Sequence, residues 1–243
     1  MSDTFTFVLD GKDVEARKEE TILAAADRAG VYIPRLCAME GLEPFGACRV
    51  CTVMVNGRPQ SACTQPAAPG IVVESDTERI RKLRTRLIEM LFVEGNHYCM
   101  FCEKSGNCEL QALGYRFGLT APTLPYQFPK REVDATHPDV LIDRNRCILC
   151  GRCVRASRDL DGKHVFGFAG RGANKKVIVN SAGRLGDTAL AMTDKAADAC
   201  PVGAILKKRL GYRIPIGRRK YDAKPIGSEI EAGGDGAKKG ATA

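Results

Sequence analysis

The chain has 243 residues, of which 44% are hydrophobic and 27% charged, and its formal net charge is +8. No apolar run approaches the roughly 18 residues of a membrane-spanning helix, and the acidic start MSDTFTFVLDG is unlike a signal peptide. Membrane insertion and secretion are therefore excluded, and a cytoplasmic protein is predicted. Thiols stay reduced in the cytoplasm, so the eleven cysteines indicate metal or cluster ligation and not disulfides.

Residues 1–76 predict a β-grasp domain, in which two hairpins enclose one helix. Residues 4–9 alternate in polarity and turn at Asp10-Gly11 into a returning strand. Thr21 is placed to cap a short helix that Gly30 ends. Later strands are expected over 50–55, from there back to Cys63, and over 71–75.

Four cysteines of this domain have the spacing Cys-x10-Cys-x2-Cys-x11-Cys; they are Cys37, Cys48, Cys51 and Cys63. Three follow the first helix and the fourth comes from a later strand, as in 2Fe–2S ferredoxins of the plant type. Gly46 and Ala47 are small enough to let backbone N–H groups point at the sulfides. Zinc is the alternative, but zinc modules usually pair two Cys-x2-Cys units and this group has one. We predict a 2Fe–2S cluster here.

Residues 77–119 predict a helical segment. Ser75 and Glu78 have the spacing of a capping box for its first helix, which Gly95 ends. The apolar face expected at helical spacing consists of Ile80, Leu83, Leu87 and Leu91, with Ile88 and Phe92 beside it. A second short helix is expected to begin at Asn107.

Between these helices the stretch NHYCMFCEKSGNC contains three cysteines: Cys99, Cys102 and Cys108. Cubane clusters and structural zinc sites both take four protein ligands. This group is therefore one ligand short.

The proline-rich residues 120–138 predict a connector, and residues 139–210 predict a ferredoxin-like module with strands near 164–168 and 176–180. Its cysteines are Cys147, Cys150, Cys153 and the remote Cys200, which precedes Pro201. Cys-x2-Cys-x2-Cys with a distant Cys-Pro is how bacterial-type ferredoxins hold a 4Fe–4S cluster. Residues 211–243 predict a tail, and the low-complexity residues 231–243 are expected to be disordered.

The fourth ligand of the middle group must be something other than thiolate, because the two outer groups use the other eight cysteines. Of the three histidines, His97 stands two residues before Cys99, whereas His137 and His164 lie in other segments. His97 is the expected ligand. Three alternatives stay open: a 4Fe–4S cluster with one histidine, a 3Fe–4S cluster on three cysteines, or zinc on the same four side chains. The neighbouring cluster groups favour the first.

No substrate site is predicted. The sequence has no P-loop and no G-x-G-x-x-G fingerprint, since Gly167, Gly170 and Gly172 do not match it. No catalytic residue is assigned. A zinc-stapled nucleic-acid binder could use the +8 charge, but the irregular first group and the lack of a basic readout helix argue against it.

The order of modules resembles one family of electron-transfer subunits. It includes the N-terminal region of the complex I 75-kDa subunit and the small (gamma) diaphorase subunits of cytoplasmic NAD-reducing nickel–iron hydrogenases; iron-only hydrogenases share its first two parts. The resemblance covers about residues 4–220, including EGNHYCMFCEKSGNCELQALGY and RNRCILCGRCVR. Complex I typically places three residues between the histidine and the first cysteine. The single Tyr98 here is the form that the soluble-hydrogenase subunits have.

The resemblance implies an α+β chain with a 2Fe–2S β-grasp domain, a helical segment with one His and three Cys ligands, and a ferredoxin-like 4Fe–4S domain. It implies a non-catalytic subunit of an NAD-reducing hydrogenase (H2 + NAD+ to NADH + H+). Expected partners are a flavoprotein diaphorase subunit, which alone holds FMN and NAD, and the small and large nickel–iron hydrogenase subunits. The alternative is the equivalent subunit of an NADH:quinone oxidoreductase or an NAD-dependent formate dehydrogenase. In complex I, that subunit is expected to continue into a large C-terminal domain.

Overall fold

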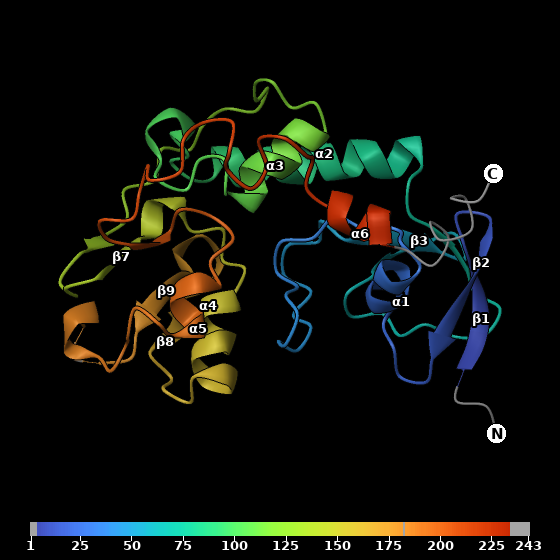
Figure 1. Cartoon of the computed structure of the whole chain (residues 1–243), viewed down its shortest axis with the longest axis horizontal. Helices are drawn as coiled ribbons and strands as arrows, with labels where there is room; N and C mark the ends of the chain where they lie inside the picture. The colour runs from blue at the N-terminus through green and yellow to red at the C-terminus, as the bar shows by residue number, and fades with distance from the viewer. Residues whose placement is uncertain (1–3, 182, 234–243) are drawn as a thin grey trace.

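The computed structural model describes residues 4–181 and 183–233. Figure 1 shows two bodies, an N-terminal β-rich one and a C-terminal one, joined across the top by two helices, α2 and α3. Helices and strands are mixed, as the predicted α+β class requires. No helix in the described ranges has the length and apolar character needed to cross a membrane.

The N-terminal body is a five-stranded sheet in the order β2-β1-β5-β3-β4, in which only β1 and β5 pair in parallel. Helix α1 (Ile22–Arg28) supplies Ile22, which packs with Phe7 of β1 in the core. The strands are β1 (Thr4–Leu9), β2 (Lys12–Arg17), β3 (Thr52–Val55), β4 (Arg58–Ser61) and β5 (Val72–Glu74). The predicted strands and helix are confirmed.

Local signals at the ends of α1 and β3 act as predicted. The Thr21 hydroxyl accepts a hydrogen bond from the Ala24 N–H at 3.2 Å, which caps α1. Gly30 has a φ of +76° just after the helix. Asn56 and Gly57 both have positive φ, which the tight turn from β3 into β4 requires.

The predicted capping box at Ser75 is wrong. Helix α2 spans Glu78–Val93, and its cap is Thr77, whose hydroxyl accepts from the Ile80 N–H at 3.3 Å. The Ser75 hydroxyl instead donates to the Asp10 carboxylate at 2.6 Å. The reason is that Ser75 directly follows strand β5, where the turn after β1 brings Asp10 alongside it.

The predicted apolar face of α2 is also wrong in part. Leu83 is 41% exposed, whereas Arg84 is 2% exposed. The Arg84 guanidinium donates to three backbone carbonyls, those of Val50, Thr52 and Ser75. The end of the sheet where β3 begins and β5 stops thus presents carbonyls that need donors, and an arginine supplies them. The buried stripe therefore runs through Ile80, Arg84 and Ile88.

The middle segment continues with a 3-10 turn η1 (Cys99–Phe101) and helix α3 (Glu109–Arg116). Helix α3 begins two residues later than expected from the sequence, and Cys108 caps it. Gly114 of α3 lies against the Phe92 ring of α2, where an added Cβ would be only 3.2 Å from the ring. The two helices therefore pack closely and fix the loop between them.

The C-terminal body contains a three-stranded sheet, β10-β7-β6, and a hairpin, β8-β9. Its strands are β6 (Val133–Asp134), β7 (Val140–Asp143), β8 (Phe166–Ala169), β9 (Lys176–Val179) and β10 (Ile205–Lys207). Its helices are α4 (Arg152–Arg155), a π turn η3 (Ala156–Leu160) and α5 (Lys195–Asp198). Short 3-10 turns are η2 (Arg144–Arg146), η4 (Gly172–Asn174) and η5 (Leu185–Asp187). The strands predicted near 164–168 and 176–180 correspond to β8 and β9.

The last described residues form helix α6 (Ser228–Gly233), which lies next to α1 in Figure 1. The expectation of disorder over 231–243 is therefore wrong for residues 231–233, which this helix includes. Residues 234–243 lie outside the described part of the chain, so the prediction stays open there.

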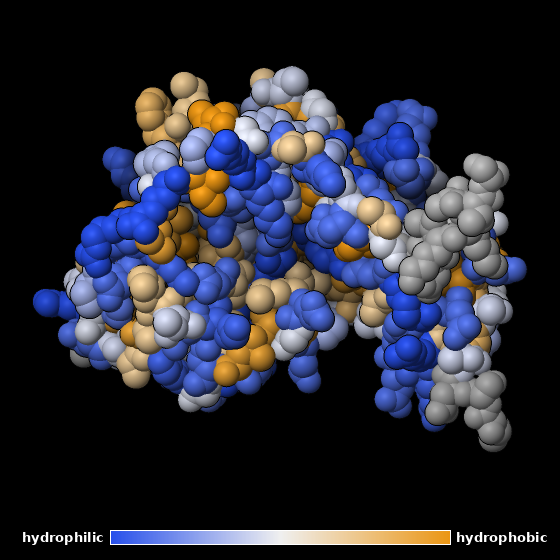
Figure 2. Space-filling model, viewed as in Figure 1, coloured by the Kyte–Doolittle hydropathy of each residue, from blue (hydrophilic) through white to orange (hydrophobic). Residues whose placement is uncertain are grey.

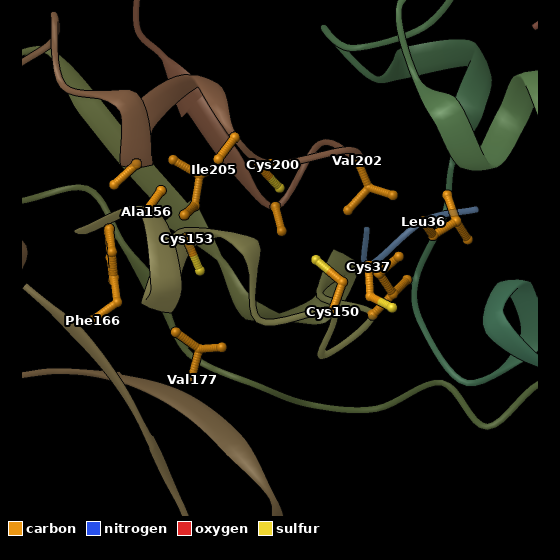
Figure 3. Packing of buried hydrophobic residues seen from close by; sticks show 14 of the residues in the cluster. Leu36, Cys37, Cys150, Cys153, Ala156, Phe166, Val177, Cys200, Val202 and Ile205 are labelled. Atoms are coloured by element: carbon orange, nitrogen blue, oxygen red, sulfur yellow. The ribbon is translucent and has the colours of Figure 1, made fainter. Parts of the chain in front are cut away.

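Two buried clusters form the core. One belongs to the β-grasp body. The other combines the C-terminal body with α2 and α3, and it also includes Leu36 and Cys37 from the N-terminal loop. Figure 3 shows Cys37 next to Cys150 in this second cluster. The loop that carries the first predicted ligand is therefore part of the core of the last module.

Candidate metal centres

The first cysteine group comes together in the loop between α1 and β3 and at the end of β4. Cys37, Cys51 and Cys63 are buried, and Cys48 is half-buried. The Cys37 N–H donates to the Cys48 sulfur at 3.4 Å. Hydrogen bonds from the thiols of Cys48 and Cys63 lower the pKa of Cys37. All four predicted side chains are therefore neighbours.

A glycine is required in this loop. Gly46 has a φ of +67°, and a Cβ there would lie 3.2 Å from the Thr64 side chain. A larger residue would both strain the backbone and push the loop away from the strand side. This agrees with the small residue that the sequence analysis expected before Cys48.

The middle group lines a small cavity, whose walls include His97, Cys99, Cys102 and Cys108. Cys108 is buried, and its sulfur accepts from the Gln111 N–H at 3.5 Å at the start of α3. That position favours negative charge on the sulfur. The structure thus brings the three cysteines and the predicted histidine to one space.

The His97 ring is arranged as metal-bound imidazoles are. Its Nε2 atom is buried and has no hydrogen-bond partner among the described residues. The ring is hydrogen-bonded to the Leu91 backbone, which leaves Nδ1 for that bond. Burial, together with the nearby Arg146 guanidinium, lowers the pKa of His97 to about 4. The ring is therefore neutral at neutral pH, with one nitrogen fixed by a carbonyl and the other free to bind a metal.

Two glycines allow the chain to approach this group closely. A Cβ on Gly95 would lie 2.6 Å from His97 Nε2, and a Cβ on Gly203 would lie 2.6 Å from the Cys102 sulfur. Gly95 therefore makes room for the imidazole, while α2 itself ends at Val93. Gly203, which the sequence analysis did not identify, comes from a segment about 100 residues away.

The third group, Cys147, Cys150, Cys153 and Cys200, lines a small cavity. Its other lining residues are apolar, except for the glycine Gly151; they are Ile142, Ile148, Val177, Val202, Ala204 and Ile205. Burial raises the pKa of Cys147 to about 11, and it raises the pKa of Cys150 and Cys153 as well. Thiolates in this space need a compensating positive centre, which metal ions would supply.

The donor sets fit multi-iron clusters. Cysteine thiolate is the usual ligand of iron–sulfur clusters, and histidine replaces it in some of them. Each of the three groups supplies four such side chains.

The other two histidines take no part in these groups. His137 Nδ1 accepts from the backbone N–H groups of Asp139 and Val140, and Nε2 donates to the Leu190 carbonyl at 2.8 Å. His164 is exposed. Both ring nitrogens of His137 are therefore used in holding the backbone.

Arg146 is a further residue that the sequence analysis missed. Its Nη1 lies 3.6 Å from the Cys102 sulfur and 3.1 Å from the Glu103 carboxylate, and its Nε pairs with Asp143. It thus places positive charge beside the middle group. Its position immediately before Cys147 was the available signal, but nothing in the sequence tied that position to Cys102.

The segment over 210–222 covers the loop of the middle group. The Tyr212 hydroxyl donates to the Phe101 carbonyl at 2.6 Å, and the Tyr221 N–H donates to the Gly106 carbonyl at 3.0 Å. Large apolar side chains nevertheless remain exposed on both segments and on the adjoining helix α3. We call them the apolar patch: Tyr98, Met100, Phe101, Tyr115, Tyr212, Ile214 and Ile216. Figure 2 shows orange atoms among hydrophilic ones along the top of the molecule.

Family models match three parts of the chain. The 2Fe-2S iron-sulfur cluster binding domain matches residues 2–78. The NADH-ubiquinone oxidoreductase-G iron-sulfur binding region matches residues 84–122, and the 4Fe-4S single cluster domain matches residues 140–206. Each matched range contains one of the three groups described above.

Known proteins resemble the whole chain or most of it. It is 40% identical over 232 residues to the NAD-reducing hydrogenase HoxS subunit gamma of Cupriavidus necator, covering 93% of this chain and 97% of that protein. It is 36% identical to the mitochondrial NADH-ubiquinone oxidoreductase 78 kDa subunit of Candida albicans, covering 84% of this chain but 29% of that protein. A chain in the crystal structure of an NAD+-reducing [NiFe]-hydrogenase in the H2-reduced state superposes with a TM-score of 0.89 at 48% identity, covering 93% and 98% of the two chains.

Proposed function

Because this chain belongs to the family of iron–sulfur subunits that includes the gamma subunit of the NAD-reducing hydrogenase HoxS, we propose that it relays electrons between a nickel–iron hydrogenase module and a flavoprotein. The flavoprotein would hold FMN and the NAD(H) site. The whole complex would convert H2 and NAD+ to NADH and H+. This chain would be its electron-transfer subunit, with no substrate site of its own.

Three clusters are proposed, on the three groups that the fold brings together. The 2Fe–2S cluster would be held by Cys37, Cys48, Cys51 and Cys63. One 4Fe–4S cluster would be held by His97, Cys99, Cys102 and Cys108, and the other by Cys147, Cys150, Cys153 and Cys200. When bound, such clusters accept and release single electrons. The chain's side chains fix their positions, exclude water and set their potentials.

The observation that carries the middle assignment is the unpartnered Nε2 of His97. Buried polar atoms in native proteins are nearly always bonded. A 3Fe–4S cluster on three cysteines would leave this nitrogen without a bond beside the thiols. Ligation by the imidazole would satisfy it. This supports the four-ligand cluster over the three-ligand one.

A hetero-oligomer in the cytoplasm is part of the proposal. The relatives named above are subunits of multi-subunit enzymes. The apolar patch supports such an assembly, since most of its exposed side chains line one surface hollow and exposed apolar surface of this kind is what subunit contacts cover. It also lies on the loop that carries Cys99 and Cys102, next to the middle cluster site. The expected partners are a diaphorase flavoprotein and the small and large hydrogenase subunits.

The alternative is an equivalent subunit of an NADH:quinone oxidoreductase or a formate dehydrogenase complex. The chain spans about a quarter to a third of the length of the complex I and NADPH-Fe(3+) oxidoreductase relatives that it matches. It spans 97% of the HoxS gamma subunit, at higher identity. A gene for a nickel–iron large subunit next to this one would favour the hydrogenase complex.

Anaerobic iron, sulfide and zinc analysis of the purified chain, combined with EPR, tests the cluster assignment. We expect about ten iron atoms per chain, two in the first site and four in each of the others. About six irons with one zinc would contradict the histidine-ligated cluster. About nine irons with a 3Fe–4S signal in the anaerobic sample would also contradict it.

A further inference from the structure

Arg155 connects the first and third cysteine groups. It is the last residue of α4, two positions after Cys153, and it is 5% exposed. Its Nη2 atom donates to the Cys37 carbonyl at 2.6 Å, and its Nη1 atom donates to the Glu43 carbonyl. One side chain of the C-terminal body is thus inserted into the loop that carries the first ligand of the N-terminal body.

The same guanidinium also binds its own motif. Nη2 lies 3.3 Å from the Cys150 carbonyl, and Nε donates to the Gly151 carbonyl at 3.3 Å. Cys37 and Cys150, which Figure 3 shows side by side, are therefore both hydrogen-bonded to Arg155. Each is a proposed ligand of a different cluster.

Aromatic rings close this junction from solvent. The Arg155 guanidinium lies 5.1 Å from the centre of the Phe45 ring, and Phe45 stacks on Phe168 of β8. Gly151 permits the approach, because a Cβ there would lie 3.0 Å from the Phe45 ring. The charge is therefore held in a place from which water is largely excluded.

No carboxylate of the described residues lies within 4.0 Å of the Arg155 guanidinium; Asp159, which attracts it from farther away, pairs with Arg158. Arg152, one turn earlier, differs: both of its terminal nitrogens contact the Glu109 carboxylate at 2.7 Å. A buried cation without a counter-charge is costly. The anions that would compensate it are the thiolate-bound clusters on its two sides.

We propose that Arg155 is a positioning residue shared by two clusters: it fixes the Cys37 and Cys150 loops against each other, and its charge raises the reduction potential of both the 2Fe–2S cluster and the C-terminal 4Fe–4S cluster. The inference rests on the proposed function, because it needs clusters at these two sites. A reduced cluster carries one more negative charge than an oxidised one, so a buried cation beside it stabilises the reduced state more.

The test is an EPR-monitored redox titration of the full chain carrying its clusters. R155Q removes the charge and keeps a hydrogen-bonding group. We expect both midpoints to fall, with each reduction equilibrium weakened about tenfold, which corresponds to about 59 mV for one electron. R155K keeps the charge, and both midpoints should stay near those of the parent chain.

Arg84 offers a matched control. It is also a buried arginine that donates to three carbonyls, but these flank only the first group. R84Q should leave the C-terminal 4Fe–4S midpoint unchanged, whereas R155Q should move it. A shift of that midpoint in R84Q as large as in R155Q would contradict a specific role for Arg155.

The remaining outcomes for R155Q and R155K separate a failure of this inference from a failure of the proposed function. The inference is wrong if R155Q leaves either midpoint potential unchanged. It is also wrong if R155K shifts both midpoint potentials as much as R155Q does. In either case, intact clusters in the parent chain would leave the proposed function standing. If R155Q does not retain its clusters, R155K decides alone: parental midpoints support the inference, and midpoints shifted about tenfold overturn it. A parent chain without these clusters would instead refute the proposed function.

Discussion

A single nitrogen atom, Nε2 of His97, would distinguish the proposed middle site from the two proposed all-cysteine sites. His97 and His137 are both held by backbone groups, but His137 uses both of its ring nitrogens in this way, whereas His97 keeps Nε2 free next to three thiols. The difference comes from what surrounds each ring. Gly95 leaves the space that the His97 ring fills. A histidine ligand is neutral where a cysteine ligand is anionic, so this choice affects the potential of the cluster.

Replacing His97 with cysteine should lower the midpoint potential of the middle cluster. The substitution adds a negative charge to the ligand set, and this disfavours the reduced state. EPR-monitored redox titration of H97C measures the effect; an unchanged or higher midpoint would refute it. H164N is the control, because His164 is exposed in another module at a φ of +50° that asparagine tolerates. It should leave all three midpoints as they are.

The residues that carry the proposed ligands could be named from spacing and counting, because the ligands of each group lie mostly within one short stretch. The residues around them could not. Arg146, Gly203 and Arg155 reach their cysteine neighbours from 44 to more than 100 residues away. Only the packed fold tells that Arg146 lies beside Cys102 and that Arg155 contacts Cys37.

Among the elements, those with a local periodic pattern or end signal could be predicted, whereas β7 and β10, which form through long-range pairing, could not. β1, β2 and α1 have periodic sequences and local end signals, and they form as expected. β7 and β10 have four and three residues and exist through their pairing with each other, which links residues 140–143 to 205–207. No local pattern encodes a pairing over that separation.

The start of α2 shows the same limit, since the predicted cap, Ser75, and the observed one, Thr77, stand two residues apart. Which one acts depends on the Asp10 carboxylate, 65 residues away, which binds Ser75. Thr77→Ala should therefore destabilise the protein by about 1 kcal/mol, as loss of a helix cap does. For a chain of this size we expect the apparent Tm to fall by about 2–4 °C.

Thermal unfolding followed by circular dichroism at a fixed scan rate measures this effect. Thr85→Ala in the same helix is the control, because its hydroxyl bonds only to the Arg81 carbonyl within α2. That change should not lower the apparent Tm. An unchanged Tm for Thr77→Ala, or an equal fall for both variants, would show that Thr77 does not cap the helix.

At the scale of the whole molecule, the proposed cluster sites are connected by one buried core and by side chains that reach from one module into another. The loop with Cys37 belongs to the same buried core as the C-terminal module, and Arg152 and Arg155 tie the two together. The middle group lies on the loop that connects α2 to α3, the two helices at the top of Figure 1. The predicted boundaries at 76, 119, 138 and 210 stay predictions, and the fold makes these segments parts of one packed unit. Such packing suits a relay, in which the distances between centres must stay constant.

The most direct test of the relay is rapid-freeze EPR on the purified complex as it is exposed to H2 and then to NAD+. We predict that the cluster signals of this chain appear under H2 before NADH accumulates, and that they decay when NAD+ is added. NADH formation at the full rate while these clusters stay oxidised throughout would contradict the relay. So would clusters that H2 reduces and NAD+ then fails to reoxidise in the active complex.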